Sequence, residues 1–189
     1  MLPEEPATNT DTIWTVSDGG VREAGTHKAR GGYGYIIKTI RESKGWGNFG
    51  YTMAGRGMVE GNNMYMDSTR AEARGLLATM LRLLASIKRY PNVQTVDHAT
   101  DNEAVVDIYA GMKGRTTAAW LRATDTDIWH EIQQAEAKFV TQGIMYKVRW
   151  VHVRSHPEKR HTWLSEWNEN DLMNSMADSL ATLAMQEYM

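Results

Sequence analysis

The feature that most constrains the fold is the order in which strand-like and helix-like segments follow one another. Three strand-like segments come first, over Thr12–Ser17, Gly31–Ile37 and Gly45–Gly55, and glycines punctuate them. Glycine-punctuated strands in succession indicate an antiparallel meander. Helix-like and strand-like segments alternate in the rest of the chain. This order predicts an α/β fold with a five-stranded mixed sheet, antiparallel in its first three strands and then parallel, flanked by helices.

The clearest helical pattern follows Glu72, where apolar residues recur at three- and four-residue spacing. Two later segments, Val93–Thr100 and the alternating Tyr146–Val153, are typical of strands. We expect the other segments to be helical. They are Asn102–Met112, Thr117–Gln142 and Asn174–Tyr188, the last with Met176, Leu180, Leu183 and Ala184 facing inward. The predicted order is therefore β-β-β-α-β-α-α-β-α.

Composition narrows the class of protein. A length of 189 residues, 42% of them hydrophobic, fits one domain with a real core. We expect residues 1–10 to form a flexible polar tail and residues 11–189 to form a single catalytic domain. No apolar run approaches the roughly 18 residues that a membrane span needs, so we expect no membrane partner and an intracellular setting, in the cytoplasm or nucleus. The absence of cysteine excludes disulfides, thiolate zinc sites and a cysteine nucleophile.

Four acidic residues stand at the predicted ends of strands or starts of helices. They are Asp18 in S-D-G-G, Glu72 in S-T-R-A-E, Asp101 in A-T-D-N and Asp178 in M-A-D-S-L-A. Ligands in α/β sheets gather at the carboxyl ends of strands, where Asp18 and Asp101 are predicted. Four carboxylates at one edge would repel one another unless cations neutralised them. The pattern therefore indicates a carboxylate cage for hard divalent cations.

Each acid also has a purely local explanation. Thr69 and Glu72 fit a capping box, with Thr69 as the N-cap of the helix. Asp101 could cap the next helix, and Asp178 lies in a similar helix start. Asp18 before two glycines could be a turn residue. Local capping explains the acids one by one, but it does not explain their convergence.

In their order along the chain, these motifs resemble those of the type 1 ribonuclease H family, from about Thr12 to Met185. The matching pieces are Asp18-Gly19-Gly20, Gly31-Gly32-Tyr33-Gly34, Arg70-Ala71-Glu72, Thr100-Asp101-Asn102, Asp127-Ile128-Trp129, His156 and Ala177-Asp178-Ser179-Leu180-Ala181. The resemblance implies an RNase H-like fold and a metal-dependent endonuclease that hydrolyses the RNA strand of RNA/DNA hybrids and leaves 5′-phosphate ends. It also implies that two Mg²⁺ ions, or Mn²⁺ as a substitute, bind to the four acids.

The resemblance assigns roles to individual residues. Asp18 would bridge both ions, Asp101 would share the water-side ion with Asp178, and Glu72 would support the leaving-group side. His156 would shuttle a proton or help product leave. The residues implied to contact nucleic acid are Gly19, Gly20, Arg22, Ser68, Thr69, Asn102, Arg115 and Trp120.

The sequence departs from the family pattern in three places. Ser68-Thr69 stands where family members carry asparagines. The basic and aromatic protrusion before Asp127 is reduced, with Lys113, Arg115, Trp120 and Arg122 remaining. The loop after His156 is long, and its S-H-P-E-K-R opening resembles domains attached to retroelement reverse transcriptases. The chain could therefore belong to a larger polyprotein.

Two other functions are compatible with the same fold. One is a DNA-cutting resolvase or transposase-like nuclease, against which the R-x-E and A-D-x-L-A motifs argue. The other is a non-catalytic scaffold module of a larger polymerase or retroelement protein. Loss of one acid would favour a scaffold, but all four positions are filled.

Overall fold

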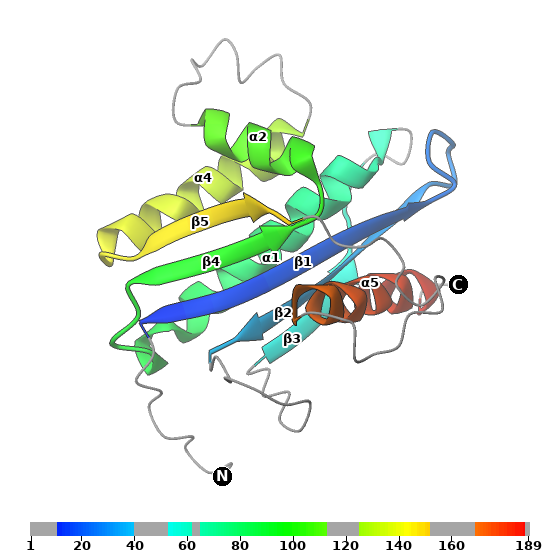
Figure 1. Cartoon of the computed structure of the whole chain (residues 1–189). Coiled ribbons are helices and arrows are strands. Elements are labelled where there is room, and N and C mark those ends of the chain that lie inside the picture. Colours follow the sequence, from blue (N-terminus) through cyan, green and yellow to red (C-terminus); the bar gives the residue numbers. More distant parts are fainter. Residues whose placement is uncertain (1–10, 40–52, 62–64, 113–124, 152–168, 188–189) are drawn as a thin grey trace.

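The computed structural model describes residues 11–39, 53–61, 65–112, 125–151 and 169–187. Its five strands form one sheet in the order β3-β2-β1-β4-β5 (Figure 1). The strands are β1 (Thr12–Arg22), β2 (Arg30–Lys38), β3 (Met53–Met58), β4 (Thr95–Thr100) and β5 (Met145–Trp150). β1, β2 and β3 pair antiparallel, whereas β4 runs parallel to both β1 and β5. The predicted five-stranded mixed sheet is confirmed.

Helices cover the sheet on both faces. They are α1 (Ser68–Ser86), the short 3₁₀ turn η2 (Ile87–Arg89), α2 (Glu103–Gly111), α4 (Thr126–Thr141) and α5 (Glu169–Gln186). α1 lies against β1 and β2 and beside α4, while α5 packs on the other face over β1, β2 and β3 (Figure 1). None of the helices in the described part of the chain has the length and apolar character needed to cross a membrane.

The main core lies between the sheet and the layer of α1, α2 and α4. Its fully buried side chains include Leu76 and Met80 of α1, Trp129 and Phe139 of α4, and Ile13 of β1. The apolar stripe predicted for the first helix is therefore largely confirmed, although Leu81 is exposed.

A histidine is built into this core as a polar link between strands. His98 of β4 is fully buried, and its Nδ1 and Nε2 lie 2.8 Å and 3.1 Å from the hydroxyls of Thr15 and Ser17. Burial lowers the pKa of His98 to about 3, so the ring is neutral. Nothing in the local sequence distinguishes His98, because a strand position alone does not reveal which hydroxyls face it.

Close packing of α5 on β2 depends on small residues in both elements. A Cβ at Gly34 would lie 2.2 Å from the carbonyl oxygen of Ala177, and one at Gly32 would lie 2.5 Å from that of Ala181. The prediction that Leu183 faces inward is wrong, because Leu183 is exposed and Ala177 and Ala181 are buried instead. The close approach of the α5 backbone to the two glycines favours alanine at Ala177 and Ala181.

Candidate active site

The sequence predicted that Asp18 ends the first strand. This is wrong, because Asp18 lies in the middle of β1. The parallel pairing of β1 with β4 stops at Val16 opposite Ala99, whereas the antiparallel pairing with β2 continues through Asp18 opposite Gly34. β1 thus extends past the end of β4. Asp18 therefore lies at the carboxyl edge of β4 even though its own strand continues to Arg22.

Asp101 directly follows β4 at this edge. It does not cap the next helix, because the N-cap of α2 is Asn102, whose side chain accepts a hydrogen bond of 3.2 Å from the Val105 amide. The capping explanation for Asp101 is therefore wrong. The carboxylate is left for another role.

Glu72 is brought to the site by an unusually close approach of α1 to β1. A Cβ at Gly19 would lie 2.3 Å from the carbonyl carbon of Ala71 and 2.4 Å from the Glu72 amide nitrogen. Only glycine permits this contact, so Gly19 places the start of α1 next to Asp18. The helix is capped by Asp67, whose side chain accepts from the Arg70 amide at 2.7 Å. The capping box proposed for Thr69 and Glu72 is therefore wrong, and Glu72 is buried at 4% exposure.

Three carboxylates meet as a result. Asp18, Glu72 and Asp101 each offer an oxygen, and these oxygens all lie within 4.8 Å of one another. Glu72 Oε2 is buried and has no hydrogen-bond partner among the described residues. An orphaned buried carboxylate oxygen is costly in a folded protein. The three carboxylates supply hard oxygen donors, and Glu72 Oε2 has no other partner among the described residues. Both features fit a divalent cation such as Mg²⁺.

The electrostatics of the cluster point the same way. Burial raises the pKa of Asp18 to about 7, and the negative charges of Asp101 and Asp178 add to the rise. Burial also raises the pKa of Glu72, with further contributions from Asp18 and from the hydrogen bond between the two side chains. Without a cation, the protein therefore retains protons on this pair near neutral pH.

Asp178 lies outside the three-residue group, but its charge acts on Asp18. The sequence predicted that Asp178 lies in the first turn of its helix. This is wrong, because α5 begins at Glu169 and Asp178 is well inside it. Packing of Ala177 against Gly34, the partner of Asp18 in β2, keeps this part of α5 near the site.

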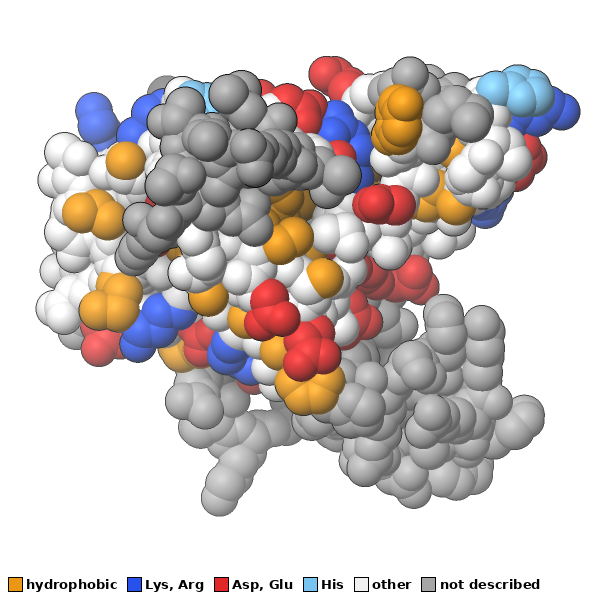
Figure 2. Space-filling model, turned by 90° about the horizontal axis from the view of Figure 1, so that it is seen from above, with side chains coloured by type: hydrophobic (Ala, Val, Ile, Leu, Met, Phe, Trp, Pro, Cys, Tyr) orange, Lys and Arg blue, Asp and Glu red, His pale blue; other side chains and the backbone are white. Residues whose placement is uncertain are grey.

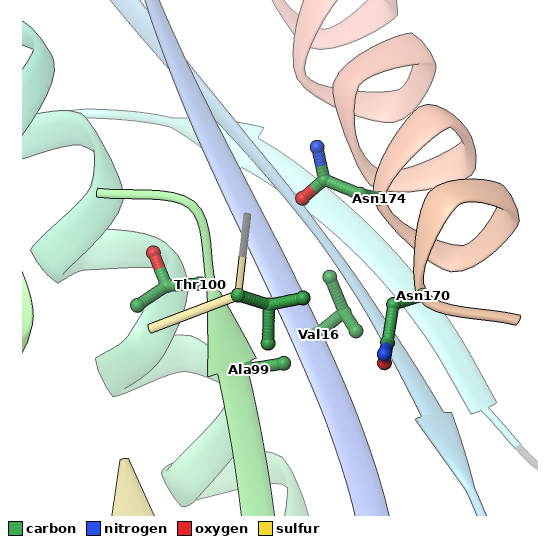
Figure 3. A pocket seen from close by; sticks show the side chains of 6 residues that line it. Val16, Ala99, Thr100, Asn170 and Asn174 are labelled. Atoms are coloured by element: carbon green, nitrogen blue, oxygen red, sulfur yellow. The ribbon is translucent and has the colours of Figure 1, made fainter. Parts of the chain in front are cut away.

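Asn174 is a site residue that sequence reasoning missed. It is 6% exposed, and its Nδ2 lies 3.4 Å from Asp101 Oδ2, while its Oδ1 is buried without a partner in the described part of the chain. Figure 3 shows Asn174 extending from α5 across a small hollow toward Thr100 at the end of β4. Its position four residues before Asp178 would place both on one helix face. The predicted helix already contained both residues, but nothing in the sequence showed that Asn174 would reach Asp101.

The residues expected to contact nucleic acid are placed unevenly. Gly19 is explained by its packing on α1, and a Cβ at Gly20 would face Met185 of α5 at 3.3 Å. The others that the structure describes lie at the end of β1 and the starts of α1 and α2. They are Arg22 and Ser68, which are exposed, and Thr69 and Asn102, which are partly buried. His156, Arg115 and Trp120 lie outside the described residues, as do Lys113 and Arg122.

Among the described residues, the face of the molecule seen from above carries no large basic patch. Figure 2 shows Lys and Arg side chains interspersed with Asp and Glu among the described residues. This agrees with the nearly balanced net charge of −2. Binding of a polyanion would therefore depend on individual basic residues and on cations in the acidic site.

Comparison with known proteins identifies the fold. No protein-family model and no curated protein matches the sequence. Solved structures match over nearly the whole chain. RNase H1 from the halophilic archaeon Halobacterium salinarum NRC-1 is 15% identical with a TM-score of 0.54, and the alignment covers 93% of this chain and 98% of that one. LC11-RNase H1, solved with an RNA/DNA hybrid, is 17% identical with a TM-score of 0.56, covering 93% and 98%.

A third match is a longer protein. The prototype foamy virus protease-reverse transcriptase is 13% identical with a TM-score of 0.60, and the alignment covers 96% of this chain but 22% of that one. These similarities show that the chain has the RNase H fold. The expected RNase H-like fold is therefore confirmed.

Proposed function

We propose that this chain is a ribonuclease H of type 1, a metal-dependent endonuclease that hydrolyses the RNA strand of RNA/DNA hybrids. The observation that carries the proposal is the meeting of Asp18, Glu72 and Asp101 within 4.8 Å in an RNase H fold. The three residues come from separate elements and lie far apart in the sequence. Each has lost its simpler explanation as a turn or cap residue.

Asp18, Glu72, Asp101 and Asp178 would together hold two Mg²⁺ ions, for which Mn²⁺ could substitute. Bound there, such ions would lower the pKa of the attacking water and neutralise charge developing on the leaving 3′ oxygen. By the family resemblance, Asp18 would serve both ions, and its pKa responds to Glu72, Asp101 and Asp178. Asn174 would hold Asp101 in place through its amide.

The protein side of substrate binding would use polar groups around the acidic site. Ser68, Thr69 and Asn102 lie at helix starts, where hydroxyl, amide and backbone N–H groups can contact phosphate or the 2′-OH. Arg22 at the end of β1 would contact phosphate, and we keep Arg115 and Trp120 as predicted nucleic-acid contacts. His156 remains our predicted proton shuttle. As part of the proposal, the foamy virus similarity supports an origin in a larger reverse-transcriptase polyprotein. The cytoplasm or nucleus stays our predicted compartment.

The proposal is tested by offering four labelled substrates to the purified protein. They are an RNA/DNA hybrid, single-stranded RNA, duplex RNA and duplex DNA, each with Mg²⁺ or with EDTA. We expect cleavage of the hybrid's RNA strand alone, only with Mg²⁺, and with 5′-phosphate ends. Cleavage of duplex DNA would instead favour a resolvase-like nuclease. A protein that binds hybrid but cuts none of the four would be a scaffold module.

A further inference from the structure

Two motif residues that the proposed chemistry does not use meet in the structure. Arg70 precedes Glu72 in R-A-E, and Asp127 begins D-I-W at the start of α4. Arg70 is 9% exposed and donates two hydrogen bonds to Asp127, Nη1 to Oδ1 at 3.0 Å and Nη2 to Oδ2 at 2.7 Å. Its Nη1 also donates to Asp125 Oδ1 at 2.7 Å. Nη2 and Nε both donate to the Glu60 carbonyl oxygen, at 2.9 Å and 3.2 Å.

All five N–H groups of the guanidinium are therefore used. We call Arg70, Asp125, Asp127 and the Glu60 carbonyl the Arg70 clamp. It joins the start of α1, the turn after β3 and the start of α4. A lysine could not replace Arg70, because an ammonium has three donors and no planar fork.

The backbone on both sides of the clamp is adapted to it. Asp125 adopts a left-handed conformation with φ 58°, which is unfavourable for a residue with a side chain. Gly61 has φ 138°, and a Cβ there would lie 2.9 Å from Arg70 Nη2. A purely adventitious surface ion pair would not require two special backbone conformations around it.

The clamp acts on the helix that carries Glu72. Gly19 fixes the start of α1 against β1 at Ala71 and Glu72, whereas Arg70 fixes the same turn against α4. The depth of Glu72 beside Asp18 thus depends on contacts on two sides of one helical turn. We propose that Arg70 is a positioning residue, which holds Glu72 at the depth that divalent-cation binding requires. This inference rests on the proposed function, because it presumes that the acidic cluster binds cations.

The test measures two quantities in the wild type and in each variant. One is the affinity for Mn²⁺, measured by calorimetry, and the other is the Mg²⁺ concentration that gives half-maximal cleavage of the hybrid. We expect Arg70→Lys to weaken Mn²⁺ binding and to raise the Mg²⁺ requirement by about tenfold or more, the usual effect of disturbing residues behind metal ligands. Cleavage should recover substantially at saturating Mg²⁺, since the ligands themselves remain. Asp127→Asn retains an acceptor and should shift both quantities in the same direction by less.

Arg149→Lys is the matched control, because Arg149 Nε pairs with Asp97 Oδ1 at 2.6 Å on β5 and β4, away from the clamp. It should leave both cation measurements unchanged. If Arg70→Lys or Asp127→Asn lowers the melting temperature but keeps wild-type cation affinity, the clamp is only structural and the inference is overturned. Should Arg70→Lys not fold, Asp127→Asn decides alone. Absence of Mn²⁺ binding by the wild type would instead overturn the proposed function.

Discussion

The Asp101→Asn variant is expected to bind an RNA/DNA hybrid and to leave it uncut. The substitution keeps the shape of the side chain but removes a negative charge from the three-carboxylate group. A bound cation contributes several kcal/mol of transition-state stabilisation, so we expect cleavage to fall by at least about 10³-fold. The fold should survive, because Asn102 and not Asp101 caps α2. Single-turnover cleavage and hybrid binding by fluorescence anisotropy measure the two effects separately.

Asp107→Asn is the matched control for this experiment. Asp107 is exposed on α2, the helix that follows Asp101, and its replacement also removes one negative charge but leaves the three-carboxylate group intact. This variant should cut hybrid at the wild-type rate. Wild-type cleavage by Asp101→Asn would remove Asp101 from the active site, and an equal loss in both variants would point to a general charge effect.

Replacing Asp18 should stabilise the metal-free protein at alkaline pH. The folded state raises the pKa of Asp18 from 3.8 to about 7, mainly through burial, so the folded protein holds a proton that the unfolded chain releases. The resulting stabilisation is complete below about pH 4 and is lost as pH rises toward 7. A shift of this size corresponds to a loss on the order of 4 kcal/mol. The pKa of Glu72 is also raised, so its contribution to the free energy of unfolding likewise falls as pH rises.

The measurement is urea unfolding in EDTA at several pH values between 4 and 8. The free energy of unfolding of the wild type should fall over this range more steeply than that of Asp18→Asn, which carries no titrating group at position 18. At pH 8 the variant should be the more stable protein. Adding Mg²⁺ should restore stability to the wild type and much less to the variant. Parallel pH profiles for the two proteins would show that Asp18 is not buried with excess negative charge.

The sheet and its helices followed from sequence because alternation, helical spacing and glycine punctuation are local signals. The positions of the site residues within their strands and helices were harder to predict, because these positions depend on packing between elements. Asp18 seemed to end a strand, since the sequence does not show that β2 pairs with β1 beyond the end of β4. The start of α5 was placed at Asn174, five residues too late, so Asp178 seemed to lie in the first turn of the helix.

The capping residues show the same limit. Thr69 and Glu72 satisfied the pattern of a capping box, but Asp67 makes the cap because it precedes the helix by one residue. Glu72 is then free to point toward Asp18. The Arg70 clamp was visible only as two separate motifs, because its partners Asp125 and Asp127 are 55 and 57 residues away in the chain.

The most direct test of the central claim is a Mn²⁺ titration of the wild type and of Asp18→Asn at pH 8, followed by electron paramagnetic resonance of the free ion. We predict saturable binding by the wild type and at least about a tenfold weaker affinity in the variant, because Asp18 is the residue on which the other three acids act. Equal Mn²⁺ affinity in the two proteins would contradict the assignment of the acidic cluster as a divalent-cation site.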